Sequence, residues 1–329
     1  MTSPNFTRQL ISACHPARRA PPDDVREIAC HALLDWLSVL CGALDQPVVQ
    51  HVLREALENG STPLATLPGL QQKLSLRDAA RFNGVASHTL DFDDTHLPSR
   101  VHPSTPLWPA VLAQAEALDL TGLQASTAFI AGVEFQSRLA AVLGEAHYAA
   151  GWHNTATLGT FGAAYATGIL LGLDETALNH AVGIAGSFAS GSRVIGSEAK
   201  PLQCGNAAAN GLYAARLAQR GVTATEGVFD EGVGYAELLS SQVLRTIDND
   251  RWFTRDIVFK YHGSCYRTQA PIQKAKSRLL LSHRFASGKI EAIHQAVMML
   301  NSASPLRDLC GLLAAPDFTP GSALLTTTE

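Results

Sequence analysis

The stretch WHNTATLGTFGAAYATGILLGL at residues 152–173 is the most informative part of the chain about the fold. It contains no Asp, Glu, Lys or Arg, and it is built mainly from Gly, Ala and Thr. Its length would suffice to cross a bilayer. However, small residues and the polar His153 and Asn154 at its start favour a helix packed closely among other helices. We therefore expect a buried core helix and no association with a membrane.

Helical periodicity extends outward from this stretch in both directions. Apolar residues at positions 25–40 follow the i, i+3, i+4, i+7 rule, and Asp24 with Glu27 predicts a capping box before them. Further helices are predicted at residues 48–58, 76–89, 106–118, 123–143, 160–171, 175–185, 206–220 and 236–244. The sequence shows few alternating strands and no regular βαβ spacing. The predicted fold class is mainly α.

The character of the chain changes near residue 257. Residues 256–261 resemble an extended segment, a helix is predicted from about residue 270, and residues 289–299 are apolar and partly β-branched. We expect a large all-helical domain over residues 1–257, followed by a smaller, incomplete α/β lid over residues 258–329.

Composition excludes several classes of protein. The chain has 329 residues, 46% of them hydrophobic and 16% charged, which suits a folded core rather than disorder. The net charge is −4 and no basic run occurs, so nucleic-acid binding is disfavoured. No two of the six cysteines form a CxxC pair, which argues against zinc ribbons and iron–sulfur sites. Residues 1–20 lack a signal-peptide core, and a cytoplasmic location is expected.

Familiar catalytic motifs do not occur either. Residues 183–191 are rich in glycine but do not form GxGxxG, and no strand is predicted before them. The P-loop pattern is absent, and Ser190 lacks the preceding glycine of a nucleophile elbow. Nucleotide binding and serine hydrolysis both lose support.

The densest polar cluster spans residues 88–103 and contains three histidines and three aspartates. His and Asp are metal ligands, but the spacing matches neither HExxH nor an EF-hand loop. Alternatively, a carboxylate or imidazole with a shifted pKa could transfer protons or bind substrate. A third interpretation is structural, with Asp94 or Thr95 capping a helix in a solvated loop.

Three further segments carry candidate residues. His153 precedes a helix of small residues, where backbone N–H groups favour anions. Lys200 is followed by proline, which predicts that it lies outside the helix at 206–220. Lys260 lies among apolar residues near the domain boundary and suits the binding of a carboxylate. Cys265 is close to His262, but nothing in the sequence orients this pair, so a packed thiol is the simpler interpretation.

Together these segments resemble the MmgE/PrpD family. The matching motifs are, in chain order, DFDDT at 91–95, His-Pro at 102–103, Gly-Trp-His at 151–153, GTFGAA at 159–164, the IAGSxASG-like segment at 184–191, KPLxxGNAA at 200–208 and FKYH at 259–262. These motifs occur in the order of the family, and the resemblance covers almost the whole chain. It implies a helical domain and a smaller lid with the active site between them, and usually a homodimer.

The resemblance also implies a chemistry. Members include 2-methylcitrate dehydratase, cis-aconitate decarboxylase and iminodisuccinate epimerase, which move a proton next to a carboxylate without a metal or organic cofactor. This implication replaces the metal interpretation of the 88–103 cluster. The most direct expectation is a 2-methylcitrate dehydratase-like lyase acting on a small polycarboxylate, with decarboxylation and epimerisation as alternatives.

Carried over residue by residue, the resemblance places six residues in the site: Asp91, Thr95, His102, His153, Lys200 and Lys260. It implies that His102 or His153 transfers the proton. Lys200 and Lys260 would bind substrate carboxylates, Asp91 would orient or tune His102, and Thr95 would hydrogen-bond substrate.

The sequence departs from the family pattern in its last part. Gln269 stands where relatives often have a histidine, and residues 325–328 offer no counterpart to a tyrosine that some members contribute. The implied lid is incomplete and the last helices of the family have no match. A second hypothesis is therefore a truncated, catalytically impaired member that persists as a folded, dimerising helical domain.

Overall fold

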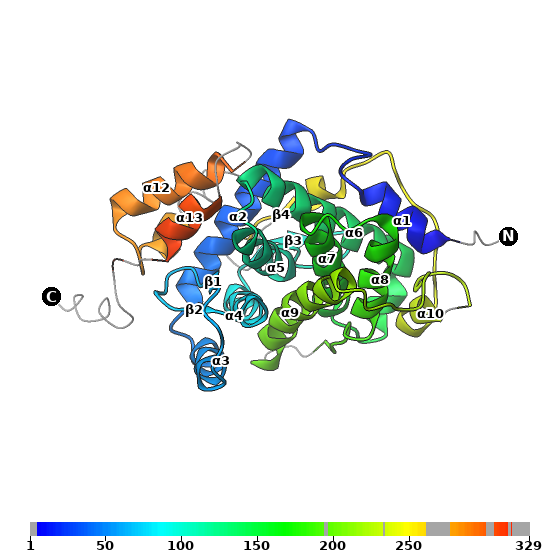
Figure 1. Ribbon diagram of the computed structural model, residues 1–329, viewed down its shortest axis with the longest axis horizontal. Helices are drawn as coiled ribbons and strands as arrows, with labels where there is room; N and C mark the ends of the chain where they lie inside the picture. The colour runs from blue at the N-terminus through cyan, green and yellow to red at the C-terminus, as the bar shows by residue number, and fades with distance from the viewer. Residues whose placement is uncertain are drawn as a thin grey trace.

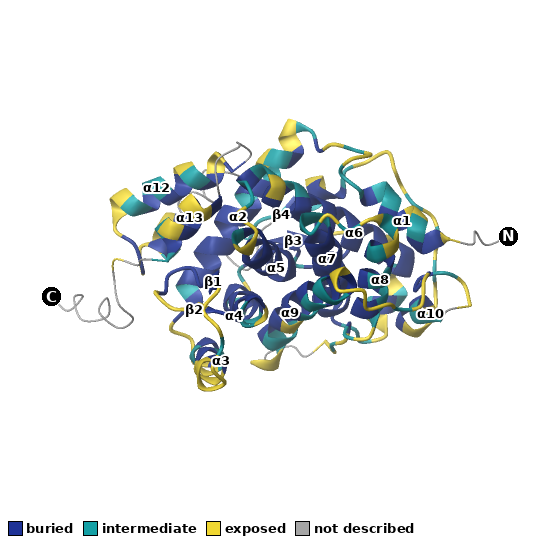
Figure 2. Cartoon of the chain, in the orientation of Figure 1, coloured by how far each residue is buried: buried dark blue, intermediate teal, exposed yellow. Residues whose placement is uncertain are grey.

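The uncharged stretch forms helix α7 (Asn154–Leu170), in which every residue from 154 to 168 is buried. It packs against four neighbours: α5 (Ser104–Ala117), α6 (Gly122–Ala149), α8 (Glu175–Gly186) and α9 (Ala199–Gln219). Figure 1 shows α7 among these helices, and Figure 2 shows that α5 and α7 are buried along most of their length. The expected core helix is confirmed.

The computed structural model describes residues 5–193, 197–232, 234–260, 277–300, 306–314 and 317. The remaining elements are α1 (Phe6–Cys14), α2 (Asp23–Ala43), α3 (Pro47–Glu58), β1 (Ala65–Thr66), β2 (Lys73–Leu74), α4 (Leu76–Thr89), β3 (Thr95–His96), α10 (Tyr235–Leu239), the 3₁₀ helix η1 (Phe253–Asp256), β4 (Ile257–Val258), α12 (Ser287–Met298) and α13 (Leu306–Leu313). The fold is mainly α, as expected.

Glycines allow the central helices to approach closely. On α9, a Cβ atom at Gly205 would lie 2.6 Å from Cγ2 of Val85 on α4, and closer still to the carbonyl oxygen of Arg81. A Cβ atom at Gly211 would lie 2.5 Å from that of Ala163 on α7. Because no larger side chain fits at these crossings, glycine lets α9 pack tightly against both α4 and α7.

The described strands form two short antiparallel pairings, and the second of them joins distant parts of the chain. β1 pairs with β2, and β3 pairs with β4, with Thr95 opposite Val258 and His96 opposite Ile257. Of the extended segment predicted at 256–261, residues 257 and 258 form β4, whereas Asp256 ends the 3₁₀ helix η1 and residue 261 lies outside the described residues. The pairing of β3 with β4 brings the segment around residue 258 beside the DFDDT motif.

Most of the described residues after β4 lie in helices, and no strand is present among them. Ile290, Ile293 and Val297 lie at helical spacing on α12 and are buried. α12 packs on α2 and α13 packs on α5, so their apolar residues join the core cluster of those helices. The β-branched content of residues 289–299 therefore forms a helix face rather than a strand, because the apolar period is that of a helix.

Some predicted helix ends were wrong. α2 has Pro22 at its N-cap and no capping side chain, and Asp24 instead pairs with Arg255. α6 breaks at Gly144, where φ is 62°, and then resumes to Ala149. α10 ends at Leu239, before the predicted end at residue 244.

Within the described residues, no single helix is both long and apolar enough to cross a membrane. Taken together, α2 and α3 are long and apolar enough by length and composition alone, but the two helices are bent by 88° relative to each other.

Candidate active site

A carboxylate between two lysines marks one side of the site. Asp91 follows the end of α4 with a φ of 48°, a left-handed conformation that aspartate tolerates better than most residues. Its two oxygens each lie 3.0 Å from a lysine, one from Nζ of Lys200 and the other from Nζ of Lys260. Partial burial opposes ionisation of Asp91, but Lys260 and Lys200 outweigh it and lower its pKa to about 2.

The two lysines come from distant elements. Lys200 lies in the first turn of α9, which begins at Ala199, and not outside the helix as predicted. The proline at 201 does not exclude it from the helix, because the first turn has no intrahelical partner for its N–H groups. Lys260 lies two residues after the end of β4 and also donates to the backbone oxygen of Asp91 at 3.1 Å.

A second carboxylate, Asp93, is fully buried and accepts three hydrogen bonds at one oxygen. Its Oδ2 lies 2.9 Å from Nδ1 of His88, 3.1 Å from Nδ1 of His102 and 2.8 Å from Oγ1 of Thr105. Burial opposes ionisation, but the two histidines outweigh it and hold the pKa of Asp93 well below its ordinary value.

The partners of the two rings fix their tautomers. Both Nδ1 atoms face the Asp93 carboxylate, and that of His102 also lies 2.9 Å from the backbone oxygen of Asp94. Since these oxygens only accept, each Nδ1 carries the hydrogen and each Nε2 carries the lone pair. Burial also lowers the pKa of His88, which favours the uncharged ring.

His102 is tied to its surroundings at several points. Its backbone N–H donates to Oγ1 of Thr155 at 3.1 Å, and its ring Nδ1 lies 3.5 Å from Oγ1 of Thr95. The neighbouring Asp94 accepts hydrogen bonds from the backbone and hydroxyl of Ser104. Burial, together with the charge of Asp35, raises the pKa of Asp94 well above its ordinary value. Asp94 is therefore a structural carboxyl group.

His153 is the N-cap residue of α7, as its place before the small-residue helix indicated. Its Nδ1 lies 2.9 Å from Oε1 of Gln203 on α9, so its Nε2 also carries a lone pair. Burial lowers the pKa of His153 to about 4, and the neighbouring His88 acts in the same direction. The ring centroid of His88 lies 4.8 Å from that of His102 and 6.0 Å from that of His153.

A cavity of about 310 Å³ opens beside this cluster. Its walls include His88, Asp91 and Lys200, together with the start of α3 around Pro47. A cavity of this size accommodates a small organic anion. Of the three histidines and two lysines, His88 and Lys200 line the cavity, while His102 and His153 contact the ring of His88 and Lys260 shares Asp91 with Lys200. Imidazole lone pairs and ammonium groups arranged in this way can bind carboxylates and move protons.

The structure gathers all six residues named by the resemblance around one cluster, but two contacts differ from the expectation. The carboxylate beside His102 belongs to Asp93, and Asp91 instead binds the two lysines. His88 belongs to the polar cluster at 88–103 but is not among the six residues that the resemblance places in the site, and its position three residues before Asp91 was the available signal. His262, Cys265 and Gln269 lie outside the described residues.

Comparisons with known proteins identify the family of this chain. The family model of the MmgE/PrpD N-terminal domain matches residues 12–245. Human cis-aconitate decarboxylase is 37% identical over 193 residues, which cover 55% of this chain and 40% of the relative. The enzyme of the same name from Aspergillus terreus is 31% identical over 221 residues, which cover 65% of this chain and 45% of the relative.

A longer but more distant match is the cis-aconitate decarboxylase-like protein oryM from Aspergillus oryzae. It is 27% identical over 306 residues, which cover 85% of this chain and 63% of the relative. The matched segments thus span between 40% and 63% of the length of these three relatives. Since the family model covers well over half of the described fold and contains five of the six expected site residues, the chain belongs to the MmgE/PrpD family.

Proposed function

We propose that this protein is a lyase acting on a small polycarboxylate, with cis-aconitate as its substrate and carbon dioxide as a product. The observation that carries the proposal is the convergence of Lys200 and Lys260 beside three histidines whose Nε2 atoms carry lone pairs. The substrate named here comes from the relatives, several of which are cis-aconitate decarboxylases.

Charge balance supports a polyanionic substrate. In the free protein, the ammonium groups of Lys200 and Lys260 both pair with the single carboxylate of Asp91, whereas Asp93 pairs with His88 and His102. A substrate carboxylate that takes the place of Asp91 between the lysines would regain a similar pair of ion contacts. The remaining substrate charge would then be offset by protons taken up on the imidazoles.

A proton taken up on an imidazole is also what the proposed decarboxylation requires. Decarboxylation breaks a carbon–carbon bond and leaves an electron pair on the unsaturated substrate, which a proton must capture at carbon. We propose that His153 or His102 delivers this proton from Nε2 once the anionic substrate has favoured its charged form. Asp93 stabilises the positive ring of His102, and Thr95 contributes a hydroxyl within the same cluster.

The family resemblance favoured a 2-methylcitrate dehydratase-like activity, whereas the relatives are named for cis-aconitate decarboxylation. The same residues suit both reactions, since each requires binding of several carboxylates and a proton transfer next to one of them. We rank cis-aconitate first because of the relatives, and we retain the expected homodimer as part of the proposal.

The test is to incubate the purified protein separately with cis-aconitate and 2-methylcitrate in EDTA, and to follow released carbon dioxide and product mass. We expect carbon dioxide and a five-carbon dicarboxylate from cis-aconitate. Loss of water from 2-methylcitrate without decarboxylation of cis-aconitate would replace the proposed reaction with dehydration. No reaction with either substrate would contradict the lyase proposal.

Two variants connect the activity to the site. Lys200→Met keeps the length of the side chain and removes its charge, so we expect KM for cis-aconitate to rise at least tenfold. His153→Gln is expected to lower kcat instead. As a matched control, Lys73→Met removes a lysine that pairs with Glu116 on the surface, and it should leave both constants unchanged.

A further inference from the structure

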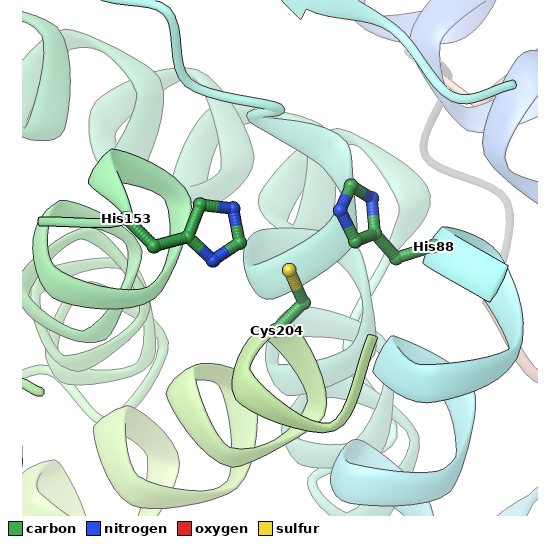
Figure 3. Close-up of side chains that lie close together, drawn as sticks. All are labelled: His88, His153 and Cys204. Carbon is green, nitrogen blue, oxygen red and sulfur yellow. The ribbon is translucent and has the colours of Figure 1, made fainter. Parts of the chain in front are cut away.

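A second kind of chemistry is available where α4, α7 and α9 meet. His88, His153 and Cys204 are all buried, and each can offer one ligand atom such that all three atoms lie within 4.8 Å of one another. Figure 3 shows the thiol of Cys204 between the two imidazole rings. A thiol flanked by two imidazoles is a donor set that thiophilic metals prefer.

The lone pairs needed for binding a metal are available. Nδ1 of His88 is occupied by Asp93, and Nδ1 of His153 is occupied by Gln203, so both rings have Nε2 to offer. Nε2 of His88 is fully buried and has no hydrogen-bond partner among the described residues. A buried nitrogen without a partner is costly and points to an interaction that the free protein leaves unmade.

The residues behind the rings match those of known metal sites. Metal-binding histidines commonly donate their other N–H to a carboxylate or carbonyl, which fixes the ring and makes the lone pair more basic. Asp93 serves His88 in this way, and the side-chain oxygen of Gln203 serves His153.

We propose that His88, His153 and Cys204 bind one thiophilic divalent cation of the Zn²⁺ or Co²⁺ type. Tetrahedral zinc has bonds of about 2.0–2.1 Å to nitrogen and about 2.3 Å to sulfur, so bound ligand atoms stand roughly 3.3–3.8 Å apart. The three side chains therefore have to close by about 1 Å. The thiol releases its proton to the buffer as the sulfur–metal bond forms. The fourth position remains for water or a substrate carboxylate.

A neighbouring group of oxygen ligands is a weaker candidate. His88, Asp91, Asp93 and His102 also lie within ligand distance of one another. However, Asp91 is already bound by two lysines, and both Nδ1 atoms that face Asp93 carry hydrogens. Because neither ring directs a lone pair toward that carboxylate, a hard cation such as Mg²⁺ finds no matched ligand set there.

The metal site shares His153 with the proposed catalytic site, so a bound cation would occupy the lone pair that transfers the proton. The cation would then act as a reversible inhibitor. This consequence rests on the proposed function, whereas the binding of the metal does not. A spectroscopic test therefore measures metal binding independently of the proposed catalytic role of His153.

The experiment is a titration of the metal-free protein with Co²⁺, followed by absorption spectroscopy. We expect a thiolate-to-cobalt charge-transfer band in the near ultraviolet, together with visible bands of tetrahedral Co²⁺, saturating at one ion per chain. Zn²⁺ should remove these bands by displacement. Cys204→Ser should abolish the charge-transfer band, whereas Cys41→Ser changes a buried cysteine outside both ligand groups and should retain it.

His153→Asn provides a second test in case Cys204→Ser does not fold, and it should weaken Co²⁺ binding at least tenfold. The absence of the band in the unmodified protein would overturn the proposal, as would its persistence in folded Cys204→Ser. If Zn²⁺ binds but does not slow the decarboxylation of cis-aconitate, the metal site stands and the proposed role of His153 fails.

Discussion

At the scale of single residues, the charge of Asp93 is central to the proposed proton transfer. Asp93→Asn can keep an amide oxygen where three donors meet, but it removes the charge that stabilises a protonated imidazole. We expect kcat to fall by roughly 10²–10⁴-fold, the range typical of losing general acid–base catalysis. Steady-state kinetics measures this loss, with far-ultraviolet circular dichroism as the check on folding.

The matched control for this variant is Asp119→Asn. Asp119 pairs with Arg307 on the surface and has a φ of 51°, a conformation that asparagine adopts readily. It should leave kcat unchanged. An Asp93→Asn protein with nearly full kcat would show that the hydrogen bonds matter and the charge does not.

A second residue-scale prediction concerns the protonation of His153. Its pKa of about 4 means that the ring is uncharged at pH 7. Propane-1,2,3-tricarboxylate, a saturated polycarboxylate, should raise this pKa by at least one unit, because negative charge nearby favours the imidazolium. Titration by NMR of labelled histidine checks the shift. His147, which is buried against Thr157 and Leu239, should not respond, and an equal response of both rings would contradict binding at the proposed site.

At the scale of the helices, the crossing of α9 with α4 sets the spacing of the site. Gly205→Ala would place a Cβ atom 2.6 Å from Val85 Cγ2, so we expect a loss of about 1–3 kcal/mol in the free energy of unfolding from overpacking. Urea denaturation measures this loss. Gly311→Ala is the control: it lies in α13 with no atom within 4 Å of the added carbon, and it should stabilise by about 0.5–1 kcal/mol. Equal effects of the two variants would show that the crossing is not tightly packed.

Helix periodicity and motif order predicted part of the fold and of the candidate site. Periodicity placed most of the helices, and ordered motifs placed six residues in one site. Periodicity could not place Lys200 in the first turn of α9, because a proline near a helix start is compatible with both sides of the boundary. It could not decide whether Asp91 or Asp93 faces His102 either, since the left-handed turn at Asp91 rotates the two carboxylates apart.

At the scale of the whole molecule, buried histidines make stability depend on pH. Burial lowers the pKa of His88 and His147, and it lowers those of His96 and His153 to about 4. Between about pH 4 and 6.5 the unfolded chain therefore binds more protons than the folded one. We expect the free energy of unfolding to decrease as pH falls through this range, by up to about 1.4 kcal/mol per pH unit for each such histidine.

Urea unfolding at pH 7, 6 and 5 measures this slope, and His96→Asn should reduce it. Asp94 contributes with the opposite sign, because its raised pKa favours the folded state at lower pH. Comparing the variant with the unmodified protein cancels that contribution. An unchanged slope in His96→Asn would show that this ring is protonated in the folded state.

The salt bridges of Asp91 have a consequence for how the molecule assembles. Lys200 and Lys260 lie 109 and 169 residues after Asp91 in the chain, and both reach it only after α9 has packed on α4 and β4 has paired with β3. Closing such long loops is slow relative to forming a helix. During synthesis, Lys260 leaves the ribosome well after both Asp91 and Lys200. The ion pairs of Asp91 are therefore expected to be among the last contacts to form, so binding of the proposed polycarboxylate between the two lysines would report a fully folded chain.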